Sequence, residues 1–320
     1  MPKLTLCLLL WILMFAACKK EKITFLIQDF SLSNQEPLRK IARLGNKAFI
    51  AGGNRWDKAS LYTYSSDEGL HEIDLSFSNF QSGLYGIVAK ENYILAVGYN
   101  GILVNSTDSG LHWHVGQQKD AKEFQSVAIK QDSVIIIGGI SFSKGYATTL
   151  SKTHFEPWDK TLTSYRFELS DIEMLTNEVG YISGYGALLK TTNGGLNWEF
   201  TSAQGDFFKA MAWENENQGV CVGNHGSILK TNNGGQTWDC IRNGNSLTKA
   251  SLSFKDVCYN GHNTYIAVGE KGLVYLSEDN GQHWKEISPF TTQMLNGVAM
   301  LSEKEGIIVG EEGGLFVFTF

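Results

Sequence analysis

The sequence predicts an all-β fold, a seven-bladed β-propeller with four antiparallel strands per blade. Three repeated features indicate this fold: a strand that ends in glycine, two apolar residues three positions apart, and a Ser/Thr-x-Asp-x-Gly-x-x-Trp box. They recur in the same phase about every 40 residues, the length of one four-stranded blade. The composition agrees, because 34 Gly, only 4 Pro and 12% aromatic residues favour many turns and strands.

Glycine-terminated strands mark seven units. They are Ala51-Gly52-Gly53, Val97-Gly98, Ile137-Gly138-Gly139, Ser183-Gly184, Val222-Gly223, Val268-Gly269 and Val309-Gly310. In four units a further glycine follows three positions on (Gly101, Gly226, Gly272 and Gly313). This spacing predicts a tight hairpin turn that needs positive φ.

Each unit begins with a pair of apolar residues. The pairs are Leu38/Ile41, Leu84/Ile87, Phe124/Val127, Leu169/Ile172, Phe208/Met211, Phe254/Val257 and Leu295/Val298. On a regular strand, side chains three positions apart point to opposite faces. We therefore expect an innermost strand that buries one residue of each pair on each face, between two neighbouring blades.

The boxes mark the last hairpin of a blade. Ser106–Trp113 and Ser277–Trp284 fit fully, Thr191–Trp198 and Thr231–Trp238 carry Asn in place of Asp, Ser65–Glu72 lacks Trp, and Ser151–Trp158 keeps only its two ends. We expect a structural role for these residues: hydrogen bonds within the turn, a left-handed glycine and a Trp wedged between the last two strands. The structural residues are Asp67, Asp108, Trp113, Trp198, Trp238, Asp279 and Trp284.

Four strands can be assigned within the fifth unit, at Phe208–Trp213, Gly219–Val222, Ser227–Thr231 and Thr237–Arg242. The seventh unit ends with its third strand, Gly314–Phe320. The β-prone segment Ile23–Ile27 belongs to no unit of its own. We predict that it supplies the missing fourth strand and closes the ring, which removes the exposed strand edges of an open array.

The N-terminus has the features of an export signal. Residues 1–17 contain Lys3, an apolar run from Leu4 to Phe15, and two alanines before Cys18. This pattern resembles a bacterial lipoprotein signal, which implies cleavage, lipidation of Cys18, a tether at residues 18–22 and a propeller over 23–320. We expect a lipid-anchored protein of the cell envelope; secretion to the periplasm without a lipid is the alternative.

Charge and cysteine content limit the other possibilities. Without Lys3 the chain has 26 basic and 33 acidic residues, and so a nucleic-acid partner is not expected. Cys221, Cys240 and Cys258 show no metal-ligand spacing, and no metal or cofactor is predicted. Three small buried thiols are favoured, with one disulfide among them as the alternative.

The run from Val222 to Trp238 resembles the repeat of photosystem II assembly and stability factors, and Ser183–Trp198 is similar to it. That family consists of seven-bladed propellers that hold partner proteins during the assembly of membrane complexes, which implies a scaffold role. The family's partner-binding surface is arginine-rich, whereas this chain has five arginines, and so the family's partner is not carried over. More distantly, the boxes resemble those of sialidases and xyloglucan-cleaving glycosidases.

An enzymatic function is the less favoured hypothesis. The sialidase resemblance would imply an arginine triad, but the five arginines of this chain are scattered. Other glycosidases need two carboxylates facing each other across a cleft. Asp171, Glu173 and Asp256 on the predicted inner strands are the best candidates for such a pair, although charged residues at these positions more often form hydrogen-bonded channel lining.

Binding is expected at the loops that converge on one mouth of the channel. The candidates at the loop tips are Arg55, Trp56, Tyr99, Asn100, Tyr185, His225 and Lys271. Arginine and aromatic residues at such tips suit a protein or sugar contact. The favoured function is a non-enzymatic, protein-binding envelope scaffold; the alternatives are a carbohydrate-binding protein and a glycoside hydrolase.

Overall fold

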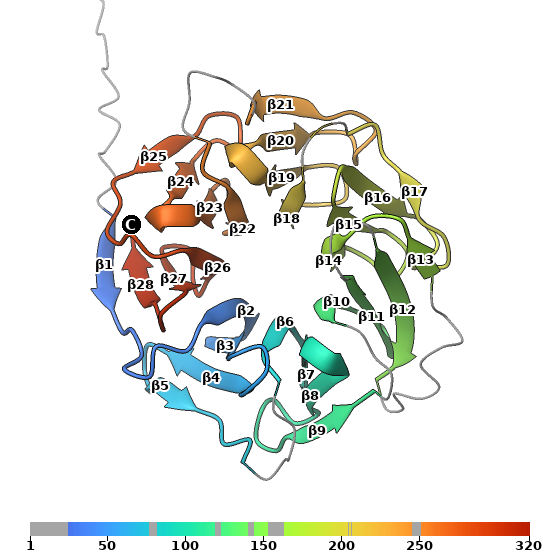
Figure 1. Cartoon of the computed structure of the whole chain (residues 1–320). Coiled ribbons are helices and arrows are strands. Elements are labelled where there is room, and N and C mark those ends of the chain that lie inside the picture. Colours follow the sequence, from blue (N-terminus) through green and yellow to red (C-terminus); the bar gives the residue numbers. More distant parts are fainter. Residues whose placement is uncertain are drawn as a thin grey trace, which may run out of the picture.

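The strands form a ring of seven sheets around a central axis (Figure 1). The structure is a computed structural model that describes residues 25–76, 82–118, 123–139, 144–152, 163–203, 205, 207–244 and 251–320. Within these ranges, each sheet has four antiparallel strands. The prediction of an all-β seven-bladed propeller is confirmed.

Blades one to six each contain four consecutive strands, which follow one another from the innermost to the outermost. They are β2 (Leu38–Leu44), β3 (Lys47–Gly52), β4 (Ser60–Ser65) and β5 (Gly69–Glu72); β6 (Leu84–Lys90), β7 (Tyr93–Gly98), β8 (Ile102–Ser106) and β9 (His114–Gln117); β10 (Phe124–Lys130), β11 (Ser133–Gly139), β12 (Gly145–Ser151) and β13 (Thr163–Tyr165); β14 (Leu169–Met174), β15 (Gly180–Gly184), β16 (Ala187–Thr191) and β17 (Glu199–Phe200); β18 (Phe208–Trp213), β19 (Gly219–Gly223), β20 (Ile228–Thr231) and β21 (Asp239–Arg242); and β22 (Phe254–Tyr259), β23 (Tyr265–Gly269), β24 (Val274–Ser277) and β25 (Lys285–Ile287). The four strands predicted in blade five agree with β18–β21 to within two residues at each end.

Blade seven combines the two ends of the chain. It contains β26 (Leu295–Met300), β27 (Glu305–Gly310) and β28 (Leu315–Thr319), and its outermost strand is β1 (Leu26–Asp29). β1 pairs with β28 in the register Leu26↔Thr319 to Asp29↔Phe316. The rings of Phe25 and Phe318 stack at 4.7 Å. The predicted closure is confirmed, with the strand placed slightly later than Ile23–Ile27; Ile23 and Thr24 lie outside the described residues.

A β-bulge at the start of every innermost strand corrects one expectation about the apolar pairs. In blade one, Leu38 pairs with Gly52 and Lys40 pairs with Ala51, so that Arg39 is an extra residue. The same shift occurs in the other six blades. Because the bulge adds one residue, the two members of each pair lie on the same face and pack in the same cluster. The expectation that they point to opposite faces was wrong.

Both faces of an innermost strand are nevertheless buried. In β10, Phe124 and Val127 pack in the cluster shared with blade two, whereas Ala128 packs in the cluster shared with blade four. After the bulge the strand is regular, so that the side chains of consecutive residues such as Val127 and Ala128 point to opposite faces. The hydrophobic core therefore consists of seven interfaces between neighbouring blades.

The glycines that end the second strand are required by close backbone approach. A Cβ on Gly98 would lie 2.1 Å from the carbonyl oxygen of Gly83, immediately before the bulge. The same oxygen accepts a hydrogen bond from the Tyr99 N–H at 2.9 Å. Equivalent contacts occur at Gly52, Gly138, Gly184, Gly223, Gly269 and Gly310, with Cβ distances of 2.1–2.4 Å. The bulge and the glycine thus form one recurring unit.

The glycines predicted to need positive φ do adopt it. Gly101, Gly226, Gly272 and Gly313 have φ between 71° and 73°. The preceding residues, Asn100, His225, Lys271 and Glu312, also have positive φ, between 53° and 55°. Two consecutive residues of this kind form a type I′ turn, whose twist matches the twist of the flanking strands.

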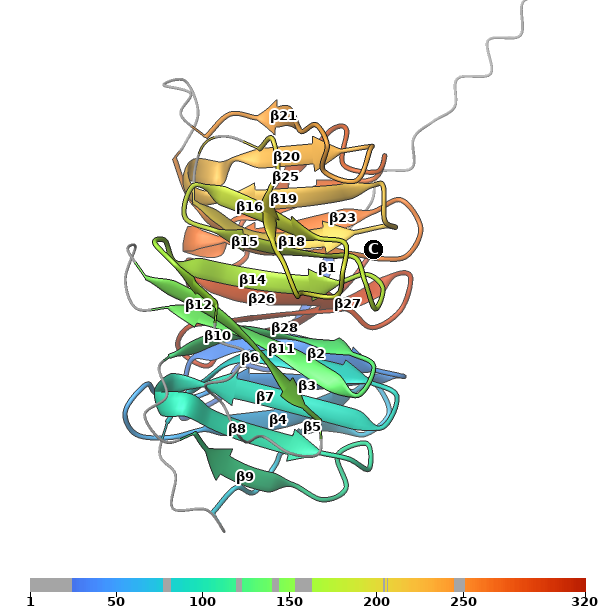
Figure 2. The ribbon, with the colours of Figure 1, turned by 90° about the vertical axis from the view of Figure 1, so that its right-hand side faces the viewer.

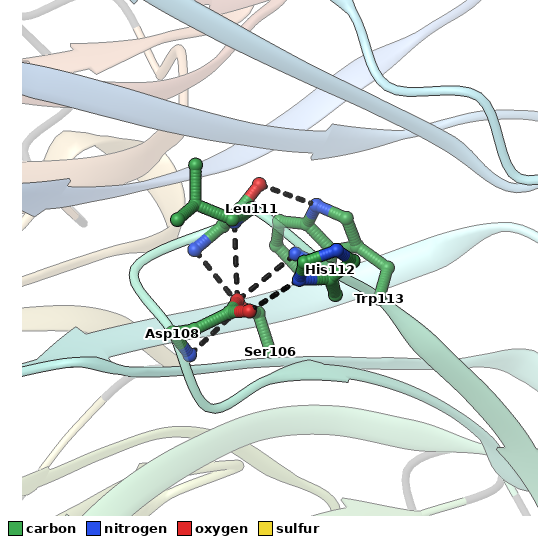
Figure 3. Close-up of polar contacts among 6 residues, drawn as sticks. Ser106, Asp108, Leu111, His112 and Trp113 are labelled. Carbon is green, nitrogen blue, oxygen red and sulfur yellow. Dashed lines mark hydrogen bonds and ion pairs between the residues drawn. The ribbon is translucent and has the colours of Figure 1, made fainter.

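The complete boxes have the predicted hydrogen bonds. Asp108 Oδ1 accepts the Ser106 hydroxyl at 2.8 Å and the His112 N–H at 2.9 Å, and Asp108 Oδ2 lies 2.6 Å from His112 Nδ1 (Figure 3). Trp113 Nε1 donates to the Gly110 carbonyl at 3.0 Å. These bonds hold the pKa of Asp108 well below its ordinary value, first through the His112 N–H and then through the His112 ring. Ser277, Asp279, His283 and Trp284 repeat the arrangement.

The four boxes with a described Trp also pack against the preceding blade, which the sequence did not reveal. A Cβ on Gly110 would lie 2.7 Å from the ring of Phe49 in blade one. Trp113, Trp198, Trp238 and Trp284 pack on the clusters that their blades share with the preceding blade, beyond the predicted position between two strands. The boxes therefore contribute to contacts between blades.

Blade one closes its last hairpin differently. Ser65 pairs directly with Gly69, and Ser65 Oγ accepts the Glu68 N–H at 3.2 Å. Asp67 is exposed in this shorter turn and cannot take the position that Asp108 has in the longer one. In blade three the box ends at Trp158, which lies outside the described residues.

The export signal, the tether and Cys18 also lie outside the described residues. In the part of the chain that is described, no helix is long and apolar enough to cross a membrane.

Candidate binding surface at the propeller mouth

One end of the ring carries the candidate loop tips. Each turn between the second and third strands lies beside the start of its blade's innermost strand, as shown by the hydrogen bond from Tyr99 N–H to Gly83 O. Figure 2 shows the short 3-10 turns η1 (Tyr99–Gly101), η3 (Asn224–Gly226) and η4 (Glu270–Gly272) at the same end of the ring. We call this end the mouth.

The structure brings three predicted residues together at the mouth. Arg55 lies over the rings of Trp56 and Tyr99, with its Cζ 5.1 Å and 4.7 Å from their centroids. The two rings contact each other edge-on at 4.4 Å, and Trp56 remains 70% exposed. Arg55 Nη2 donates to Glu123 Oε2 at 2.7 Å. This aromatic–arginine cluster therefore joins blades one, two and three and presents an indole to solvent.

The other predicted residues lie elsewhere around the mouth. Tyr185, which is 49% exposed, packs edge-on against Phe207 at 5.6 Å, between blades four and five. Asn100, His225 and Lys271 occupy the same position in three type I′ turns. Asn and His adopt this backbone conformation more readily than most residues, so that Asn100 and His225 have a structural reason to be there that is independent of any contact with a partner; the conformation gives no such reason for Lys271.

A cavity of about 290 Å³ lies at the centre of the mouth. Its lining includes the second residue of every innermost strand, the residue that the bulge adds. This mouth ring consists of Arg39, Tyr85, Gln125, Ser170, Lys209, Lys255 and Asn296. Lys40 and Glu123 complete the lining. The ring was not expected from the sequence, because residue spacing alone does not reveal the bulge.

Below the ring, each of two aspartates connects three blades. Asp256 Oδ1 accepts a hydrogen bond from Lys40 Nζ at 2.7 Å, and its Oδ2 accepts the Val298 N–H at 3.0 Å. Asp171 accepts the Ser126 hydroxyl at 3.0 Å and the Met211 N–H at 3.2 Å. Each carboxylate thus uses both of its oxygens to hold other blades, which favours the interpretation as hydrogen-bonded channel lining.

Glu173, the third candidate carboxylate, has a raised pKa. Burial, and then the negative charge of Asp171, raise it to about 8, although Lys40 opposes the shift. Burial also raises the pKa of Asp256, while Lys40 opposes this. For Lys40, burial acts to lower the pKa, but Asp256, Asp171 and Glu173 outweigh it and leave the pKa above its ordinary value. The channel therefore contains the Lys40–Asp256 ion pair and, beside it, a carboxyl group whose pKa is raised toward the neutral range.

The described residues include no group of three or more His, Cys, Asp or Glu side chains that could hold a metal ion. Cys221, Cys240 and Cys258 are free thiols. Cys221 is buried, whereas Cys258 is partly buried and Cys240 is exposed, so that the expectation of three buried thiols was wrong for Cys240.

The repeat matches a known family. Residues 204–297, which span blades five and six, match the family model described as photosynthesis system II assembly factor YCF48. This match confirms the resemblance seen in the sequence. No curated protein matches the chain.

Solved structures of YCF48 have the same architecture as this chain. YCF48 bound to D1 peptide is 15% identical, covers 92% of this chain and 97% of its own, and has a TM-score of 0.67. YCF48 from Cyanidioschyzon merolae is 14% identical, with coverages of 92% and 98% and a TM-score of 0.66. The WD40 repeats of RRP9 reach a TM-score of 0.69 at 11% identity, with coverages of 92% and 97%. At these identities the likeness shows a shared fold.

Proposed function

We propose that this chain is a non-enzymatic scaffold of the cell envelope that binds a partner protein through the propeller mouth. The aromatic–arginine cluster of Arg55, Trp56 and Tyr99 carries the proposal, because it presents a largely exposed indole on a support fixed by an ion pair. Arginine and aromatic side chains are the residues that most often dominate protein interfaces. The YCF48 structure with a bound D1 peptide supports a protein partner for this type of propeller.

The hydrogen bonds in the channel support a non-enzymatic function. A glycosidase needs one carboxylic acid and one carboxylate that are both available to the substrate. Asp171 and Asp256 instead use their oxygens to join blades. The Asp171→Asn and Asp256→Asn variants should therefore be less stable than the unmodified chain. The unmodified chain should show no glycan-cleaving activity.

Affinity capture from native membranes tests the partner proposal. We expect a defined partner that is recovered at least about tenfold less when Arg55, Tyr99 and Tyr185 are all changed to Ala, since loss of interface anchors of this kind costs more than about 1 kcal/mol each. Substitution of Leu111, Leu196 and Phe200 by Ala is the matched control, because these exposed apolar residues lie on blades two and four outside the mouth. Equal recovery with both sets of substitutions would refute the assignment.

Carbohydrate binding is the second candidate, since an exposed indole such as that of Trp56 can stack on a sugar ring. Thermal stabilisation by a glycan that is lost in Trp56→Ala, together with no partner protein in the capture experiment, would favour it over the scaffold function.

The envelope location is tested separately through Cys18. We expect the chain in the membrane fraction, and expect Cys18→Ala to release it, because an acylated cysteine would be the anchor. Cys240→Ala, which changes an exposed thiol on β21, is the control and should leave the location unchanged. A Cys18→Ala protein that stays in the membrane fraction would contradict lipid anchoring.

A further inference from the structure

The end of the ring opposite the mouth consists of two sets of turns, and we call it the far end. One set joins the first and second strands of each blade, and the other joins the third and fourth strands, where the boxes lie. In blade two the Ser109 N–H donates to the Asn92 carbonyl at 2.9 Å, and in blade four the Gly194 N–H donates to the Glu178 carbonyl at 2.8 Å. These bonds hold the two sets of turns side by side.

The N-terminal strand begins at the far end. β28 runs from the mouth to the far end, and the C-terminus marked in Figure 2 lies opposite the 3-10 turns. Because β1 is antiparallel to β28, it starts at the far end, where Leu26 pairs with Thr319. Next to this pair, the Phe320 N–H donates at 3.1 Å to the carbonyl of Lys304, in the turn between β26 and β27. An anchor that precedes β1 is therefore attached at the far end.

The predicted tether is too short to turn the mouth toward a membrane. Cys18 precedes Phe25 by seven positions, and a fully extended chain of that length spans at most about 24 Å. With the mouth against the membrane, the tether would have to span the whole height of the ring. The seven-residue strand β2 alone is about 23 Å long, and turns extend beyond both of its ends. An acylated Cys18 therefore excludes an orientation with the mouth on the membrane.

Exposed leucines provide a second, independent observation. Leu111 and Leu196 follow the box glycines of blades two and four and are 79% and 78% exposed. Leu26, at the far end of blade seven, is 61% exposed. The three leucines are thus spaced around one end of the ring, on blades that are two apart. An apolar layer that covers the far end can bury all three side chains, which is favourable.

The charges at the far end indicate which lipid surface suits it. The turns between first and second strands carry more acidic than basic residues, namely Glu91, Asp132, Glu178, Glu214, Glu216 and Glu303 against Lys304. A membrane surface rich in anionic lipids would repel these turns, because like charges face each other. A zwitterionic surface carries no such penalty.

We propose that the far end rests on a zwitterionic bilayer through Leu26, Leu111 and Leu196, and that the mouth points away from the membrane. This orientation rests on the proposed lipid anchor at Cys18. It also deepens the proposed function, because a partner protein then reaches the mouth from the aqueous side and not from within the bilayer that holds the anchor.

Energy transfer from fluorophores at the two ends tests the orientation. The lipidated full chain, purified from membranes, is reconstituted on phosphatidylcholine vesicles that carry an acceptor dye on a lipid headgroup. One chain is labelled at Asp57→Cys, in the mouth loop that contains Trp56, and another at Gln282→Cys, in the box turn of blade six; both positions are exposed. A Cys240→Ala background removes the exposed native thiol. Burial raises the pKa of the Cys221 and Cys258 thiols and makes them poorly reactive.

We expect energy transfer at least about twofold more efficient from position 282 than from position 57, because a six-residue strand such as β3 separates the two ends by about 20 Å. Equal transfer from both positions, or more efficient transfer from position 57, would overturn the proposal. Melting curves of each labelled chain identify any failure to fold.

The double variant Leu111→Ser and Leu196→Ser tests the contact itself. We expect transfer from position 282 to fall toward the value from position 57, because the far end loses its apolar contacts with the bilayer. Gln236→Ser, at the equivalent box position of blade five, is the control and should leave the transfer unchanged. Unchanged transfer in the double variant would refute contact through the leucines.

Flotation of the vesicles distinguishes failure of the orientation from failure of the anchor. An unmodified chain that does not float with the vesicles would contradict the lipid anchor and the orientation together. A chain that floats but transfers equally from both positions would contradict the orientation alone. Capture of a partner through the mouth is measured separately and depends on neither result.

Discussion

Lys40 of blade one and Asp256 of blade six form an ion pair of 2.7 Å that passes over blade seven. Gly297 takes the corresponding position on the innermost strand of blade seven and has no side chain to intervene. Asp256 also accepts the Val298 N–H of that blade. One buried carboxylate therefore holds three blades together at their innermost strands, and the middle one of the three is the blade that contains both ends of the chain.

Loss of Lys40 should leave Asp256 buried without its counter-charge. We expect Lys40→Met to lower the free energy of unfolding by about 3 kcal/mol, as for other broken buried pairs. Urea unfolding measures this free energy. Lys90→Met, at an exposed position on β6, is the control. Adding Asp256→Asn should recover part of the loss, because Asn still accepts the Val298 N–H. Strict additivity of the two substitutions would argue against the pair.

Glu173 should make stability depend on pH. Its folded pKa of about 8 exceeds the ordinary 4.5, so that between these values the folded chain holds a proton that the unfolded chain has released. The corresponding stabilisation is complete below pH 4.5 and is lost as the pH rises through 8.

In Glu173→Gln this contribution cannot titrate. We therefore expect the melting temperature of the unmodified chain to fall by at least about 2 °C more than that of the variant over this pH range. Thermal melts across the range measure the difference. Glu178→Gln, at an exposed position, should retain the dependence of the unmodified chain. Parallel curves for Glu173→Gln and the unmodified chain would contradict a raised pKa.

The glycine beside each bulge should not tolerate a side chain. Gly98→Ala would place its Cβ 2.1 Å from the Gly83 carbonyl, and we expect a loss of about 1–3 kcal/mol, the range for overpacking. Gly116→Ala in the same blade is the matched control, since a Cβ there meets nothing within 4 Å. Urea midpoints that fall equally for both variants would show that the close approach is not the reason for the glycine.

Closure by β1 should be necessary for full stability. A chain that begins at Ser31 lacks β1 and the Phe25–Phe318 stack, and leaves the edge of β28 unpaired. We expect its melting temperature to fall by about 5 °C or more, the effect of losing a few kcal/mol. A chain that begins at Phe25 keeps β1 and is the control. Similar melting curves for the two chains would contradict the closure.

The sequence was sufficient for the fold because its signals are local and repeated. The strands of blade five, the type I′ glycines and the closing N-terminal strand all follow from turn chemistry and strand length, which neighbouring residues determine. The apolar pairs indicated the right number of units, but the orientation expected for their side chains was wrong. The bulge places Leu38 and Ile41 on the same face of the strand, and residue spacing alone does not reveal a bulge.

The site was predictable only in part. Arg55, Trp56 and Tyr99 were expected at loop tips, but their mutual contact depends on how three blades meet. The Lys40–Asp256 pair spans 216 positions in the sequence and requires the ring to be closed. The mouth ring could have been found by comparing the second residue of each innermost strand, once the bulge was known.

Site-specific photo-cross-linking tests the proposed binding surface most directly. A photoreactive amino acid would replace Trp56 in the mouth in one variant, and Leu111, which is 79% exposed outside the mouth, in another. With native membranes present during irradiation, we predict a defined protein adduct from position 56 and none from position 111. Adducts from position 111 alone, or equal adducts from both positions, would contradict binding through the mouth.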